Sequence, residues 1–181
     1  MILDRIKDFQ RRPYEAKAIE LLQDVGQYPG LQPWKEHDVR FRLIRLPSYE
    51  AYSVWALHQS DGIYRVRRLE WDRLLDAQKP ASAPTLFGAD AELPRKSVQQ
   101  LLIELSLIAL PPFLPVSTIG LDGISHAVEF GDCWRSASLA WWGKPPRQWR
   151  ALAEWYGQAV KLFEQFLPVS EARHPELSRG I

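Results

Sequence analysis

The sequence predicts an α+β fold in which helices pack on one face of one or two antiparallel sheets, and three observations lead to this class. Apolar residues recur at helical spacing in segments 13–25, 95–109 and 147–167. Between these segments, apolar and polar residues alternate as they do in half-buried strands. Asp61-Gly62 and Asp122-Gly123 are typical of tight turns between antiparallel neighbours. The predicted order is therefore α-βββ-α-βββ-α.

In the first half of the chain, the main predicted helix begins at Pro13 and ends near Gly26. Proline is tolerated at the first helical position because its missing N–H would be unpaired there anyway, and glycine commonly ends a helix. A shorter helix over residues 2–10 is expected before it. Residues 77–94 are rich in Ala, Pro and Ser and are expected to form a loop. The predicted strands of this half lie near 39–44, 51–58 and 63–70.

The second half is expected to repeat this order. Pro111-Pro112 ends the helix at 95–109. The last helix, 147–167, places Phe163 on its apolar face, and the polar tail 169–181 is expected to fray. The strands of this half are predicted at 116–121, 124–130 and 133–142. The whole chain, 1–181, is of a length that suits a single domain.

Composition and charge exclude several classes of protein. Hydrophobic residues make up 46% and charged residues 25% of the 181 residues, as in a folded domain. A net charge of +1 argues against a surface built for nucleic acid. Segment 101–116 is too short and too interrupted by Glu104 and prolines to span a membrane, and the charged N-terminus lacks a signal-peptide pattern. The single cysteine, Cys133, permits no intrachain disulfide, so we expect a cytoplasmic protein.

The sequence contains no recognisable catalytic, metal-binding or cofactor-binding motif. None of the four histidines stands at ligand spacing from another, and no phosphate-binding glycine loop or nucleophile elbow occurs. Cys133 and His126 lie on neighbouring predicted strands, but nothing in the sequence places them opposite each other, so we expect an inert thiol. The sequence therefore predicts a non-enzymatic protein without metal or cofactor.

Arginines on the predicted strands are candidate binding residues. In a two-residue hairpin, Arg65 lies opposite His58 and Arg67 lies opposite Ala56. Arg40 and Arg42 share one face of the preceding strand. These four guanidinium groups would form a site for an anion or an acidic partner if the strands are adjacent. The alternative is a solvated face on which arginine stems cover apolar surface.

Trp141 and Trp142 are candidates for a protein-binding surface. Adjacent strand residues point to opposite faces of a sheet, so both indoles cannot enter the same core. One of them needs cover from a helix or loop of the same chain, or from another protein. We expect one tryptophan among Trp134, Trp141, Trp142 and Trp155 to be substantially exposed and to belong to a binding surface.

The C-terminal quarter combines a strand between two turns, a Trp-Trp strand, a proline pair and an amphipathic helix. The residues that form this pattern are Leu121-Asp122-Gly123, Gly131-Asp132, Ser138 to Gly143, Pro145-Pro146 and Trp149. In this pattern, the segment resembles small uncharacterised bacterial proteins, some of them predicted immunity proteins of toxin systems. This resemblance implies a protein that binds and blocks a partner toxin and has no reaction of its own.

We therefore expect a bacterial, cytoplasmic protein whose partner is another protein. The runner-up is a binding module for a small anion or nucleic acid that uses the arginine-bearing face. An enzyme of unrecognised type is the third alternative.

Overall fold

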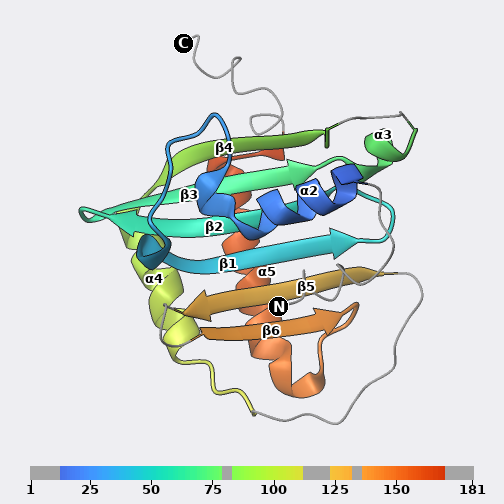
Figure 1. The fold of residues 1–181 in the computed structure, drawn as a ribbon. Helices are drawn as coiled ribbons and strands as arrows, with labels where there is room; N and C mark the ends of the chain where they lie inside the picture. Colours follow the sequence, from blue (N-terminus) through green and yellow to red (C-terminus); the bar gives the residue numbers. More distant parts are fainter. Residues whose placement is uncertain (1–12, 79–82, 112–122, 132–135, 170–181) are drawn as a thin grey trace.

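Six antiparallel strands form one sheet in the order β4-β3-β2-β1-β5-β6 (Figure 1). The structure is a computed structural model, and it describes residues 13–78, 83–111, 123–131 and 136–169. The strands are β1 (Val39–Pro47), β2 (Tyr52–Ser60), β3 (Ile63–Trp71), β4 (Leu86–Leu93), β5 (Ile124–Gly131) and β6 (Ser136–Trp142). The predicted α+β class is confirmed.

The described helices lie before, between and after the strands. Of these, α2, α4 and α5 carry the packing, and α5 is the longest. The helices are α2 (Pro13–Gln23), α3 (Arg73–Gln78), α4 (Arg95–Ser106) and α5 (Arg150–Phe166), with short 3-10 turns η1 (Val25–Gln27), η2 (Glu36–Asp38) and η3 (Arg147–Trp149). None of them combines the length and the apolar character that a bilayer crossing requires.

The β2–β3 hairpin has the predicted turn and register. Asp61 and Gly62 have φ of 52° and 76°, which is the left-handed region that a two-residue hairpin turn requires. Asp61 accepts this conformation because its short polar side chain tolerates it better than most residues do. As predicted, Arg65 lies opposite His58 and Arg67 opposite Ala56.

Helices cover both faces of the sheet, which corrects the expectation of a single covered face. In Figure 1, α2 crosses in front of β1–β3, while α4 and α5 lie behind the sheet. The apolar residues of α2 pack with Val54 and Ala56 of β2, whereas those of α4 and α5 pack with Trp55 and Leu57. Because β2 is apolar at successive positions, it has to be buried on both sides. Phe163 of α5 is fully buried, as predicted.

The second half of the chain differs from the predicted repeat. Strand β4 lies within the segment 77–94 that was predicted as a loop, and it pairs with β3 along its whole length. Its composition, with Gly88 and two acidic residues, is poor in strand-forming residues, so pairing with a buried neighbour decides its conformation. The predicted strands at 124–130 and 133–142 correspond to β5 and β6, although residues 133–135 lie outside the described part.

Three other predicted features lie outside the described residues. They are the helix at 2–10, the strand at 116–121 and nearly all of the tail at 169–181.

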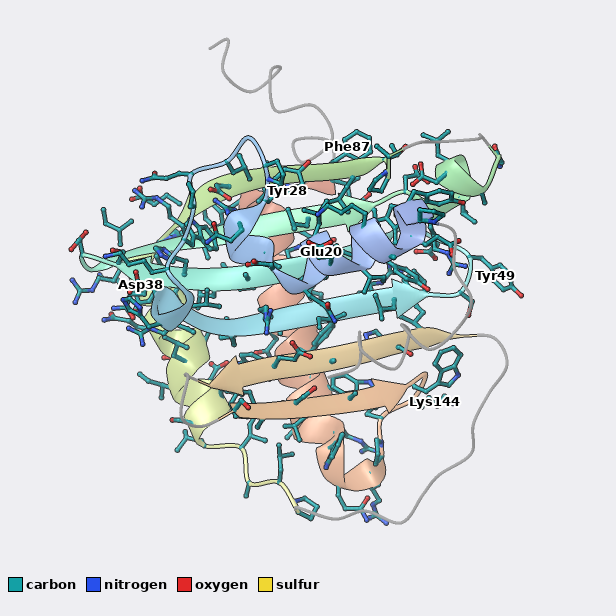
Figure 2. The ribbon with its side chains drawn as sticks, in the orientation of Figure 1. Glu20, Tyr28, Asp38, Tyr49, Phe87 and Lys144 are labelled. Carbon is teal, nitrogen blue, oxygen red and sulfur yellow. The ribbon has the colours of Figure 1, made fainter. Side chains whose placement is uncertain are left out.

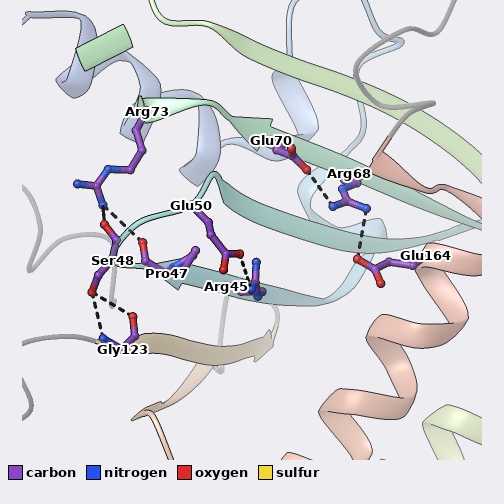
Figure 3. Close-up of polar contacts among 9 residues, drawn as sticks. All are labelled: Arg45, Pro47, Ser48, Glu50, Arg68, Glu70, Arg73, Gly123 and Glu164. Carbon is purple, nitrogen blue, oxygen red and sulfur yellow. Dashed lines mark hydrogen bonds and ion pairs between the residues drawn. The ribbon is translucent and has the colours of Figure 1, made fainter. Parts of the chain in front are cut away.

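Side-chain contacts join strands and helices that are far apart in the sequence. Ser48 and Gly123 exchange hydrogen bonds, which join the end of β1 to the start of β5 (Figure 3). On the face of the sheet that α5 covers, Nη1 of Arg68 in β3 lies 3.5 Å from Oε1 of Glu164 in α5 (Figure 3).

Candidate binding face at the β5–β6 end of the sheet

Arg67 of the predicted arginine set is buried and serves the fold. Its side chain is completely shielded, although guanidinium groups are rarely buried unless they are paired. Its Nε and Nη2 donate to the two carboxylate oxygens of Asp90, at 2.6 and 2.7 Å. The remaining donors bond the backbone carbonyls of Val25, Gly26 and Gln32. The guanidinium also lies 4.1 Å from the centre of the Trp34 ring. Arg67 therefore fastens the segment after α2 to the sheet.

Arg42 binds the same end of α2 from β1. Its Nη1 donates to the carbonyl of Gln23, in the last turn of the helix. Cations are favourable there because the last carbonyls of a helix lack intrahelical partners and carry partial negative charge. Its Nη2 lies 3.3 Å from a carboxylate oxygen of Glu129 on the neighbouring strand β5.

The other two arginines of the set remain near the surface. Arg40 is exposed, and its Nε donates to the side chain of Gln59 at 3.0 Å. Arg65 is half-buried and lies between His58 of β2 and Glu92 of β4 in the strand register. The structure therefore places two of the four arginines against α2 and the segment that follows it, and the other two near the surface, so the four do not form one exposed site.

A cavity of about 740 Å³ lies beside the C-terminal end of α2. Its walls come from the end of α2, η1 and the ends of β1, β5 and β6, so it forms where α2 stops covering the sheet. The polar and charged side chains among its lining residues belong to Gln23, Asp24, Gln27, Arg40, Arg42, Glu129, Ser136 and Ser138. The cavity is mixed in polarity, with both acidic and basic side chains in its wall.

Glu129 is the most unusual group in this cavity. Its side chain is only 5% exposed, and Oε1 accepts a 3.4 Å hydrogen bond from Ser138. Oε2 receives no hydrogen bond from the described residues, although Arg42 lies 3.3 Å away. A buried acceptor without a hydrogen bond is costly, typically about 1–3 kcal/mol, so Glu129 contributes an unsatisfied acceptor beside the cavity.

The α2-side surface of β6 continues from this cavity. Side chains of Ser136, Ser138 and Ala140 are exposed there, and Trp142 is half-buried at the far end. In Figure 1, α5 passes behind β5 and β6, and no described helix lies in front of β6. We call Glu129 together with Ser136, Ser138, Ala140 and Trp142 the open face.

The tryptophan pair divides between the two faces, as predicted from strand geometry. Trp141 is buried behind the sheet, where it contacts His126 and Tyr156 with ring centres 5.3 and 5.5 Å apart. Trp142 lies on the α2 side, against the backbone of Gly123. Trp155 is also buried, and Trp134 lies outside the described residues. The described tryptophans thus include no highly exposed indole, and Trp142 is the accessible member of the pair.

His58 and His126 have lowered pKa values. Neither forms a catalytic arrangement with a nucleophile among the described residues. Desolvation lowers the pKa of His126, and Arg45 lowers it further. Desolvation also lowers the pKa of His58, which Asp38 partly opposes and Arg65 and Arg67 reinforce. His58 stacks on Trp34 at 4.5 Å between ring centres. Among the described residues no group of His, Cys, Asp and Glu side chains could hold a metal ion.

Sequence reasoning missed Glu129, although the sequence contains a signal for it. Glu129 is the one charged residue within the apolar strand that runs from Ile124 to Gly131. It shares a face with Ala127, which is fully buried, so alternation would have placed its carboxylate on a covered face. A carboxylate on such a face needs a partner, and its position in the wall of a cavity could not be foreseen from the sequence.

Comparison of the chain with protein-family models, curated proteins and solved structures found no match.

Proposed function

We propose that this chain is a non-enzymatic protein-binding protein that holds its partner on the open face. The observation that carries the proposal is the buried carboxylate of Glu129, whose Oε2 lacks a hydrogen bond in the wall of an accessible cavity. Oε2 is itself shielded from solvent, so a partner that offers an N–H or O–H donor at the cavity would satisfy this oxygen once the Glu129 side chain turns toward it.

The surroundings of Glu129 favour a macromolecular partner over a small charged ligand. Arg42 and Glu129 compensate each other's charge, so the pair offers little net attraction to a free cation or a free anion. A neutral donor on a protein loop does not need such attraction. The small side chains of Ser136, Ser138 and Ala140 let a partner backbone approach closely, and Trp142 offers an aromatic contact at the end of the strip.

The resemblance of the C-terminal quarter narrows the proposal to an immunity-type protein of a bacterial toxin system. Trp142 and the β6 residues Ser138 and Ala140 belong to the run that carries this resemblance. A cytoplasmic location, which the single cysteine favours, fits such a role. We do not propose an anion or nucleic-acid module, because Arg67 and Arg42 are engaged within the fold.

The test is to isolate the chain with its partner from the native host, identify the partner and reconstitute the pair from purified proteins. Glu129→Gln replaces one acceptor oxygen by a donor while keeping the shape of the side chain. We expect it to weaken binding by tenfold or more, equivalent to about 1.4 kcal/mol.

Glu50→Gln is the matched control, because Glu50 is a largely exposed carboxylate paired with Arg45 away from the cavity. It should leave the affinity unchanged. The proposal is wrong if no partner binds at fixed stoichiometry, or if Glu129→Gln binds the purified partner as tightly as the unaltered chain does.

A further inference from the structure

Within the described part of the chain, the outer edge of β6 lacks the features that usually prevent strands from pairing. Edge strands present unpaired N–H and C=O groups, and proteins protect them with charges, prolines, bulges or covering segments. The run Ser136–Trp142 contains neither a charged residue nor a proline. The side chains of Ser136, Ser138 and Ala140 are exposed, so the described residues do not cover this strand on the α2 side.

The backbone groups that face outward from β6 can be assigned from its pairing with β5. The N–H of Gly143 donates to the carbonyl of Ile124 at 2.8 Å, so residue 143 faces β5. Backbone groups of successive residues point to alternate sides in an antiparallel strand. Those of Ala137, Leu139 and Trp141 therefore face β5. The outward groups belong to Ser136, Ser138, Ala140 and Trp142.

We propose that this edge pairs with β6 of a second copy of the chain, antiparallel, about a two-fold axis at Leu139. Leu139 is the middle residue of β6, so this register pairs the whole strand. It places Ser138 opposite Ala140 and Ser136 opposite Trp142 of the other copy. All of these residues carry outward backbone groups, so each such pair can exchange two hydrogen bonds. One sheet would then run continuously through both copies.

Side-chain sizes in β6 are complementary to themselves in this register. On the α2 side, each Trp142 indole faces the small Ser136 of the other copy. On the α5 side, each Trp141 faces Ala137, and the two Leu139 side chains meet at the axis. Opposed side chains determine much of the stability of a strand pair, and a large residue beside a small one avoids crowding. Because β6 has no charge, self-pairing brings no like charges together.

This inference does not depend on the proposed partner, because it concerns the edge of β6 and is tested with the purified chain alone. Light scattering after size-exclusion chromatography, over a dilution series, should give twice the chain mass at the higher concentrations. Ser138→Lys places a charge next to the two-fold axis, opposite Ala140 of the other copy. This charge should prevent strand pairing, so the variant should have the mass of a single chain. Ser97→Lys adds the same charge at an exposed position of α4 and should leave the dimer intact.

The register is tested by disulfide formation in a Cys133→Ser background. Leu139 meets itself in a pair without hydrogen bonds, with Cα atoms about 4.5 Å apart, which suits a disulfide. Leu139→Cys should therefore form a covalent dimer rapidly under mild oxidation, whereas Ala137→Cys, which faces Trp141, should not. The proposal is overturned if the chain has single-chain mass at every concentration, if Ser138→Lys remains dimeric, or if the two cysteine variants crosslink equally.

Discussion

Strands β4 and β6 form the two edges of the same sheet, but the described residues cover the edge of β4 and leave the edge of β6 open. At β4, the outward carbonyl of Leu86 accepts a hydrogen bond from the hydroxyl of Tyr28 at 2.9 Å, and the Tyr28 ring lies against Gly88 (Figure 2). Asp90 and Glu92 add charge along the same strand. At β6, neither charge nor a described side chain protects the backbone. A guarded edge limits association, so the difference indicates which edge is available to another molecule.

The position of Tyr28 against the edge of β4 depends on Arg67. Tyr28 lies in the segment between α2 and β1, and Arg67 bonds this segment on both sides of Tyr28, at Gly26 and Gln32. The side chains of Arg67 and Asp90 at this end of the sheet are thus paired within the chain. At the β5–β6 end, Glu129 retains an oxygen without a hydrogen bond from the described residues. The comparison shows that Tyr28 covers the edge of β4, whereas the described side chains leave the edge of β6 open.

Arg67→Ala should have the largest effect on this comparison. It leaves the Asp90 carboxylate and three carbonyls without their donor, and removing one partner of a buried ion pair typically costs about 3–5 kcal/mol. Urea unfolding should give a free energy of unfolding lower by that amount. Arg65→Ala, which removes an arginine from the same strand face, should change it by less than about 0.5 kcal/mol. Equal effects would show that Arg67 is not the anchor.

Gly88→Ala should destabilise the guarded edge by a smaller amount. A Cβ atom at this position would lie 2.6 Å from the Tyr28 ring and 2.7 Å from Leu69, so side chains have to move. Overpacking of this kind typically costs about 1–3 kcal/mol. Thermal unfolding of Gly88→Ala, Tyr28→Ala and the double variant measures the coupling. A purely additive double variant would mean that the ring does not press on Gly88.

Tyr28→Phe should have a weaker effect, because it removes only the hydroxyl bonded to Leu86. One such hydrogen bond contributes about 0.5–1.5 kcal/mol. Hydrogen exchange should report the same loss. In the variant, the increase in amide exchange rate should be larger in β4 than in β2. Unchanged exchange in β4 would contradict a guarding role for the hydroxyl.

The smallest expected effect concerns His126 behind the β5–β6 end. Its lowered pKa means that the unfolded chain takes up a proton near the ordinary value of about 6.5 while the folded chain does not. Stability is therefore full above that pH and falls as the pH falls toward the lowered pKa. His126→Phe should reduce this loss in denaturant unfolding at successive pH values. His37→Gln, at a side chain that is 68% exposed, is the comparison variant and should leave the loss assigned to His126 in place.

Local chemistry was sufficient to predict the central part of the fold. The hairpin of β2 and β3 follows from Asp61-Gly62, because Asp-Gly favours the type I′ turn, with positive φ at both positions, that joins two antiparallel strands by a two-residue loop. The apolar face of α5, with Phe163 at its centre, follows from helical periodicity. By contrast, β4 has weak strand propensity, and its pairing with β3 could not be inferred from its own residues.

The candidate site was predicted only in part. The sequence identified Arg42, Arg67 and Trp142 but not their roles, because exposure of an arginine on a strand depends on what packs over it. Covering by α2 and its following segment turned Arg67 into a buried anchor. The end of α2 also left Glu129 in the wall of a cavity.

The sequence by itself determined the antiparallel hairpins, the helical faces and the division of Trp141 and Trp142 between two faces, because each depends on backbone geometry over a few neighbouring residues. Tertiary structure alone decided that helices cover both faces and that β4 and β6 lie at the edges. It also decided that Arg67 is fully hydrogen-bonded, whereas one oxygen of Glu129 lacks a hydrogen bond from the described residues. Those outcomes depend on contacts between segments far apart in the chain, and local periodicity does not specify which distant segment will cover a given side chain.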